Sequence, residues 1–225
     1  MPRGSKHNVY ATMKILSSRK GPAWFGSHAA FLRELLQEPR AVGAVCPSSN
    51  ALARRMAHWA VSGPTGWVIE LGGGTGTVTA ALLQRGVPRE RLIVVERSLY
   101  FVNHLRNRFP GVRIIHGDAA DLAHAALSGE PVTSIVSGLP LRSMPAHAVS
   151  QVVRGCTRVL NTNSRVIQFT YAPRAGSAWS AAGMHRLANE AVWRNLPPAR
   201  IEVFTPTTDT PLAKAAQRNA DQREF

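Results

Sequence analysis

The sequence lacks the features that mark several specialised classes of protein. Its two cysteines, Cys46 and Cys156, are too few for a disulfide framework and too far apart for a thiolate metal motif. Eight histidines occur without a His-x-x-x-His pair or a Cys/His cluster, so we expect no metal site. No run of about 18 apolar residues is present, and residues 1–21 contain no apolar signal segment. We therefore expect a cytoplasmic protein without a membrane-spanning helix.

Acidic residues are also scarce. The chain has 13 Asp and Glu against 27 Lys and Arg, which gives a formal net charge of +14. Such an excess favours nucleic acid, anionic membrane lipid or acidic small molecules as partners, without choosing among them. The 225 residues predict one domain with short additions, and the 44% of apolar residues are typical of a globular chain rather than a disordered one.

The N-terminal quarter differs in pattern from the rest. Residues 1–22 are polar and basic, which predicts a flexible arm, and residues 23–60 predict two helices. The first helix has an apolar face that includes Phe31 and ends before Pro39. The second follows Ser48 or Ser49, either of which can cap it. The polar residues 206–225 predict a frayed tail.

Between these ends, over residues 61–205, short β-branched runs alternate with helical patterns. This alternation predicts βαβ units and a doubly wound parallel α/β sheet. The last two runs are joined by NLPP, too short a link for a crossover helix, so we expect them to form a terminal antiparallel hairpin. The expected strands are WVIEL, RLIVVE, VRIIHGD, TSIVSGLP and SRVIQFTY, followed by the hairpin strands at 188–194 and 200–204.

A glycine-rich turn follows the first strand. In VIELGGGTG, Gly72, Gly74 and Gly76 let the backbone adopt positive φ and let a ligand approach closely. The dinucleotide fingerprint needs its third glycine one residue later, where Thr77 stands. Glu70 is badly placed for a pyrophosphate and well placed for a cationic cofactor, which favours S-adenosylmethionine.

Two more acids are expected at the same edge of the sheet. Glu96 ends the second strand and could accept both ribose hydroxyls, while Asp118 follows the third strand and could accept the adenine amino group. The carboxyl ends of parallel strands are where open α/β sheets bind ligands. The alternative interpretation is that both acids merely cap the helices that follow them.

These motifs resemble class I S-adenosylmethionine-dependent methyltransferases over roughly residues 40–205. Within that superfamily, VSGLPL, VIQFTYAPR, VWRNLPPAR and the segment FLRELLQEPRAVGAVCPSSNALARRMA look like bacterial phospholipid N-methyltransferases, which act on phosphatidylethanolamine. The resemblance implies a Rossmann-like, seven-stranded, mostly parallel sheet with a terminal antiparallel hairpin and an N-terminal helical extension. It also implies S-adenosylmethionine as cofactor and a phospholipid as substrate.

The resemblance places the acceptor beside the fourth strand. The Ser137 hydroxyl and the Gly138 and Leu139 carbonyls are expected to hold the attacking nitrogen, with Ser137 also beside the cofactor. Ser137 stands where enzymes that modify bases carry an amide or an acid, and Leu141 stands where they carry an aromatic, so nucleic acid is a less favoured partner.

Side chains beyond this loop could bind a lipid headgroup. The ring of Tyr171 could hold a methylated ammonium, and Arg142 and Arg174 could bind phosphate. Each arginine could equally be an ordinary solvated surface charge.

The N-terminal helix is open to two interpretations. Trp24, Phe25 and Phe31, with Lys20 just upstream, suit an interfacial helix beside anionic lipid, and the same stripe could pack on the domain or act as a lid. The resemblance favours docking on the inner face of the cell membrane.

Three other functions stay open. The charge suits an RNA adenine N6-methyltransferase, although such enzymes usually add a helical C-terminal domain. The chain could methylate another aminolipid, such as an ornithine lipid. It could also be a basic membrane- or nucleic-acid-binding protein that keeps a vestigial fold, and the intact glycine loop weighs against that.

Overall fold

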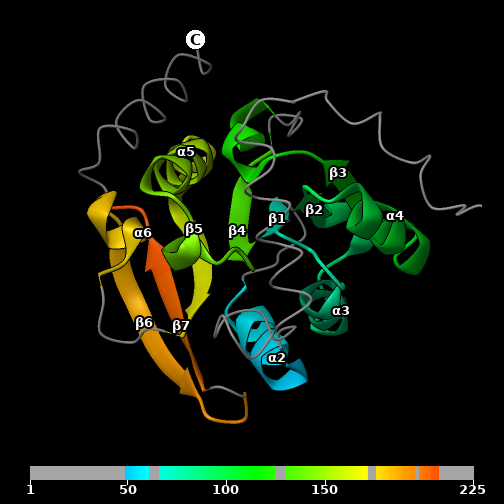
Figure 1. Ribbon diagram of the computed structural model, residues 1–225, viewed down its shortest axis with the longest axis horizontal. Helices are drawn as coiled ribbons and strands as arrows, with labels where there is room; N and C mark the ends of the chain where they lie inside the picture. The colour runs from blue at the N-terminus through cyan, green and yellow to red at the C-terminus, as the bar shows by residue number, and fades with distance from the viewer. Residues whose placement is uncertain (1–48, 61–65, 125–129, 172–175, 196–197, 208–225) are drawn as a thin grey trace, which may run out of the picture. The chain divides into compact units, whose positions relative to one another are not determined.

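The computed structural model describes residues 49–60, 66–124, 130–171, 176–195 and 198–207. Helices and strands alternate along most of this part of the chain, as expected (Figure 1). The helices are α2 (Asn50–Trp59), α3 (Thr77–Gln84), α4 (Leu99–Arg108), α5 (Ala146–Thr157), α6 (Ala178–Ala181) and the 3-10 turns η1 (Arg89–Arg91), η2 (Ala119–His124) and η3 (Leu141–Ser143). The strands are β1 (Trp67–Leu71), β2 (Leu92–Glu96), β3 (Arg113–His116), β4 (Val132–Ser137), β5 (Leu160–Thr170), β6 (His185–Val192) and β7 (Ala199–Thr205).

The seven strands form one sheet in the order β3-β2-β1-β4-β5-β7-β6. Strands β1 to β5 pair in parallel, which places their carboxyl ends at one edge. Strand β7 runs antiparallel to both β5 and β6, so β6 runs in the same direction as the parallel strands. The predicted seven-stranded, mostly parallel sheet with a terminal antiparallel hairpin is confirmed.

Helices cover both faces of the sheet because buried parallel strands are apolar on both sides. Val68 and its neighbours on one face pack against α2, α3 and α4, whereas Ile69 and its neighbours on the other face pack against η2, α5 and Trp179 of α6. Figure 1 shows α5 and α6 apart from the group formed by α2, α3 and α4. The two apolar layers leave the ends of the strands for polar side chains.

Helix α2 begins where the sequence predicted. The Ser49 hydroxyl accepts a hydrogen bond from the Leu52 N–H at 3.2 Å, so Ser49 rather than Ser48 caps the helix. The buried side of the helix carries Leu52 and Met56 against the core. None of the helices among the described residues has the length and apolar character needed to cross a membrane.

Local structure departs from expectation at three places. The segment DLAHAAL after Asp118 has a helical pattern, but its described part is a 3-10 turn, because the Asp118 carboxylate accepts the Ala120 N–H at 2.9 Å and closes a tight turn. The short helix α6 was not predicted, since four residues carry no period. Strand β6 begins at His185 and ends at Val192, so Trp193 and Arg194 belong to the turn that follows.

Several expectations fall on other parts of the chain. The basic arm at 1–22, the helix predicted at 23–37 and Cys46 lie outside the described residues, as does the tail beyond residue 207. Cys156 is buried in α5, and burial raises the pKa of its thiol to about 12. An apolar environment that suppresses the thiolate makes Cys156 a small core residue.

Candidate functional site

The glycine loop joins β1 to α3 at the carboxyl edge of the sheet. Gly72 has φ of +76° and lies so near the fourth strand's loop that a Cβ would be 2.9 Å from Leu139 Cδ2. Gly138 approaches from the other side, where a Cβ would be 2.9 Å from the Gly72 carbonyl oxygen. Gly74, at φ +51°, has open space where a side chain would stand. The loop is therefore closed by β4 on one side and can admit a ligand at Gly74.

Glu96 holds this loop from the next strand. Its Oε2 accepts the Gly74 N–H at 2.9 Å and its Oε1 accepts the Ser98 N–H at 2.7 Å. Each carboxylate oxygen has a second lone pair, so these bonds leave acceptor capacity for the hydroxyls of a ribose. The predicted cofactor role and the helix-capping interpretation are thus compatible in one side chain.

Glu70 lies deeper than its expected role suggests. Its side chain is 1% exposed, and its Oε2 accepts the Thr79 hydroxyl at 2.6 Å, which joins β1 to α3. Burial raises the pKa of Glu70 to about 8, and the nearby Glu96 carboxylate adds to the rise while the Thr79 hydrogen bond opposes it. A cation bound in front of the loop would favour the ionised form of Glu70. Direct contact between Glu70 and a cationic cofactor stays a prediction.

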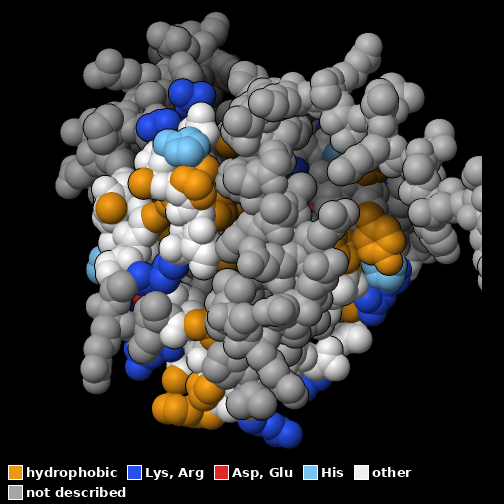
Figure 2. Space-filling model, in the orientation of Figure 1, with side chains coloured by type: hydrophobic (Ala, Val, Ile, Leu, Met, Phe, Trp, Pro, Cys, Tyr) orange, Lys and Arg blue, Asp and Glu red, His pale blue; other side chains and the backbone are white. Residues whose placement is uncertain are grey.

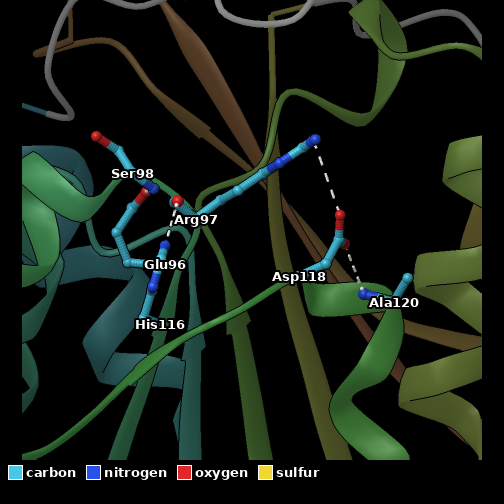
Figure 3. Close-up of polar contacts among 6 residues, drawn as sticks. All are labelled: Glu96, Arg97, Ser98, His116, Asp118 and Ala120. Carbon is cyan, nitrogen blue, oxygen red and sulfur yellow. Dashed lines mark hydrogen bonds and ion pairs between the residues drawn. The ribbon is translucent and has the colours of Figure 1, made fainter. Parts of the chain in front are cut away.

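Asp118 lies beyond Glu96 along the same edge. Figure 3 shows its carboxylate between Ala120, whose N–H it accepts, and Arg97, whose guanidinium is 3.8 Å away. His116 Nε2 lies 3.1 Å from the Arg97 carbonyl and braces the turn after β2. The structure therefore places Glu96 and Asp118 on adjacent strands at one edge, as the sequence predicted.

The acceptor loop follows β4 and is held mainly by its own backbone and by β5. Ser137 is fully buried, and its hydroxyl accepts the Leu139 N–H at 3.4 Å. The Leu139 carbonyl accepts two hydrogen bonds, from the Leu141 N–H at 2.9 Å and from Gln168 Nε2 at 3.0 Å. Both of its lone pairs are then used, so in this conformation the Gly138 carbonyl is the better candidate to hold an acceptor nitrogen.

Gln168 is the residue that sequence analysis missed. Its side chain is 5% exposed and lies in β5, where it donates to the Leu139 and Phe169 carbonyls and lies 3.5 Å from the Trp179 indole nitrogen. A buried amide with each polar atom engaged is a rigid support. The sequence contains one signal of this role. Gln168 is an amide within the apolar run VIQF, and a polar residue in such a run is expected to be buried and hydrogen-bonded.

Two of the candidate headgroup residues, Arg142 and Tyr171, lie near the end of β5. Arg142 Nε donates to the Thr170 hydroxyl at 2.9 Å, so the exposed guanidinium is oriented along this edge. The Tyr171 ring packs edge-on against Phe169, with centroids 5.5 Å apart. Arg174 lies outside the described residues, as do Lys20, Trp24, Phe25 and Phe31, the candidate membrane contacts.

Asn195 connects this region to α2. Its Nδ2 donates to the Tyr171 hydroxyl at 3.4 Å, and its Oδ1 accepts the Ser49 N–H at 3.2 Å. Asn195 itself is buried, at 2% exposed. Nothing in the local pattern of NLPP signals this role, because its partners are 24 and 146 residues away in sequence.

Comparison with known proteins identifies the chain as a methyltransferase. Residues 68–163 match a methyltransferase domain family. The chain is 31% identical over 179 residues to an ornithine lipid N-methyltransferase of Singulisphaera acidiphila, covering 75% of this chain and 91% of that protein. It is also 34% identical over 146 residues to a ribosomal RNA small subunit methyltransferase A of Erythrobacter litoralis, covering 62% of this chain and about half (51%) of that protein.

Solved structures share the fold. The N-methyltransferase NodS of Bradyrhizobium japonicum, in complex with S-adenosyl-L-homocysteine, superposes with a TM-score of 0.60 at 12% identity, over 80% of this chain and 98% of that one. The open face of Gly74 and the spare acceptor capacity of Glu96 fit a cofactor of this kind. The chain therefore belongs to the class I S-adenosylmethionine-dependent methyltransferases, in one family with the ornithine lipid enzyme, and its cofactor is S-adenosylmethionine.

Proposed function

We propose that this protein methylates the amine of a membrane aminolipid at the membrane surface. The observation that carries the proposal is the similarity to the ornithine lipid N-methyltransferase, which extends over 91% of that protein. The ribosomal RNA enzyme is matched over only half its length. Ser137 and Leu141 support the same choice, because they replace the amide or acid and the stacking aromatic that would suit a flipped base.

The acceptor loop suits an amine. When bound, S-adenosylmethionine supplies an electrophilic methyl group on a sulfonium centre. The task of the chain is to hold a neutral nitrogen in line with that methyl, and positioning of this kind can contribute up to about 7–11 kcal/mol. In the proposal, the Gly138 carbonyl accepts a hydrogen bond from the amine of the substrate. Ser137 and Gln168 fix the loop through their hydrogen bonds to the Leu139 backbone.

The headgroup residues suit an acceptor that carries both an amine and an anionic group. The Tyr171 ring can face the ammonium product, and Arg142, oriented by Thr170, can bind phosphate or carboxylate as a fork. Phosphatidylethanolamine offers a phosphate and an ornithine lipid offers a carboxylate. The relative's activity favours the ornithine headgroup, and phosphatidylethanolamine, which the sequence motifs suggested, is the other candidate.

One labelling experiment tests the proposal. Purified protein is incubated with methyl-labelled S-adenosylmethionine and with vesicles that contain ornithine lipid, vesicles that contain phosphatidylethanolamine, or ribosomal RNA. We expect label in a lipid, with more in ornithine lipid, and much less label with a Glu96→Ala control. Label in RNA alone would overturn the proposal, and label in phosphatidylethanolamine alone would reverse the order of the two headgroups.

A further inference from the structure

One aromatic side chain at the site's edge has no role in the fold. Trp193, in the turn after β6, is 79% exposed, although tryptophan is usually largely buried. Four large hydrophobic side chains are exposed among the described residues, and the other three are Leu99, Tyr100 and Leu187. Exposure of an indole to water is unfavourable in free energy, and docking on a partner would remove this exposure.

The turn carrying Trp193 lies at the acceptor end of the sheet. Strand β6 runs parallel to β5, and Arg200 of β7 pairs with both Thr170 at the end of β5 and Ala191 near the end of β6. Two residues after Trp193, the buried Asn195 holds the turn to Tyr171 and to the start of α2. The turn is thus fixed beside the proposed headgroup residues.

The charges around the turn are positive. Arg194 is exposed directly after Trp193. Glu190, the nearest acid before it in sequence, is paired with Arg55 and accepts the Trp59 indole N–H at 3.1 Å. Figure 2 shows hydrophobic and basic side chains together at the lower end of the view, where the β6–β7 turn lies in Figure 1. An exposed indole next to an arginine suits the interface of an anionic bilayer, where the ring lies at the level of the headgroups and the guanidinium meets lipid phosphate.

We propose that the turn after β6 docks on an anionic lipid bilayer, with the Trp193 indole in the interfacial region and Arg194 against lipid phosphates. The inference rests on the proposed function, because it gives the lipid acceptor a direct route from the bilayer to Tyr171. It assigns membrane contact to Trp193 and Arg194, which belong to the methyltransferase domain itself.

Binding to vesicles tests this assignment. The full chain is floated with vesicles of phosphatidylcholine containing phosphatidylglycerol, and with phosphatidylcholine alone. Trp193→Ala is expected to weaken binding to the anionic vesicles several-fold, and Arg194→Gln about fivefold. Tyr100→Ala is the matched control, since Tyr100 is 75% exposed but follows β2, five strands away in the sheet. Unchanged binding of Trp193→Ala, or an equal loss in Tyr100→Ala, overturns the proposal.

A second measurement covers the case in which other parts of the chain dominate vesicle binding. Brominated acyl chains quench the fluorescence of indoles that enter the bilayer. Vesicles with brominated lipid should therefore quench the tryptophan fluorescence of the wild-type protein more than that of a Trp193→Phe variant. If the two proteins are quenched equally, Trp193 does not enter the bilayer and the docking proposal is wrong.

Activity separates this proposal from the proposed function. We expect Trp193→Ala to lose methylation of acceptor lipid in vesicles and to keep methylation of the same lipid in mixed detergent micelles. Wild-type protein that binds vesicles through Trp193 but methylates no lipid would refute the aminolipid function and leave the docking surface standing. Equal loss in vesicles and micelles would place Trp193 in acceptor binding and refute docking.

Discussion

The two halves of the site are held together in different ways. On the cofactor side, the glycine loop, Glu96 and Asp118 follow consecutive strands, and each acid bonds to backbone groups of the turn after its own strand. On the acceptor side, local bonds within the loop are joined by contacts from Gln168 and Asn195, which are distant in sequence from what they hold.

This difference has a functional consequence. The cofactor half uses backbone geometry and carboxylates at the ends of strands, the edge where open α/β sheets bind ligands. The acceptor half depends on buried side-chain amides, which must be fully satisfied to be tolerated. Changes at buried amides should therefore alter the acceptor and leave the cofactor bound, so the two halves can be separated by mutation.

The largest expected effect is on the cofactor half. Glu96→Ala removes the carboxylate that accepts the Gly74 and Ser98 N–H groups, and with it any bond to the ribose. We therefore expect the Kd for S-adenosylmethionine, measured by titration calorimetry, to rise about 100-fold. Glu90→Ala, an exposed acid in η1, is the control and should bind normally. Normal binding by Glu96→Ala would show that the loop needs no support from β2.

The next effect should fall on the acceptor half alone. Gln168→Met keeps a side chain of similar length but has no donor for the Leu139 carbonyl, so the loop should lose its support while the core stays filled. We expect kcat/KM for the acceptor to fall about tenfold or more, with the Kd for S-adenosylmethionine within about twofold of wild type. A matching loss of cofactor affinity would contradict the separation of the two halves.

A smaller effect tests the ring of Tyr171. Tyr171→Leu should raise the KM for the acceptor about threefold, since a cation–π contact at a partly exposed ring contributes about 0.5–1 kcal/mol. Tyr171→Phe keeps the ring and loses the 3.4 Å contact of the hydroxyl with Asn195, so its KM should remain close to wild type. If Phe is as poor as Leu, the hydroxyl matters and the ring does not.

The smallest effect concerns stability and pH. The pKa of Glu70 is about 8 in the folded protein against 4.5 as its ordinary value, so the folded state binds the extra proton between these values. Stability linked to Glu70 is therefore fully present below about pH 4.5 and is lost as pH rises through about 8. Glu70→Gln should flatten this decline, with a Tm a few degrees above wild type at pH 8 and similar at pH 4.5. Parallel Tm profiles for the two proteins would show that Glu70 is not the titrating group.

Sequence reasoning reached the cofactor half because its signals are local. ELGGGTG, Glu96 and Asp118 each stand directly after a strand whose apolar run is visible in the chain. It assigned the Leu139 carbonyl to the acceptor without seeing that Gln168 and Leu141 use both of its lone pairs. It ended β6 two residues late because VW continues the apolar run, although the chain turns after Val192 and leaves Trp193 exposed.

The sequence alone determined the order of the elements, the mostly parallel sheet with its final hairpin, and the acids at the carboxyl edge, because period, length of link and residue type are properties of neighbours in the chain. The tertiary structure decided that Glu70 is buried beside Thr79, that Gln168 supports the acceptor loop and that Asn195 joins Tyr171 to α2. Burial and long-range hydrogen bonds arise only when distant segments meet, and a polar residue in a chain does not reveal which partner will satisfy it.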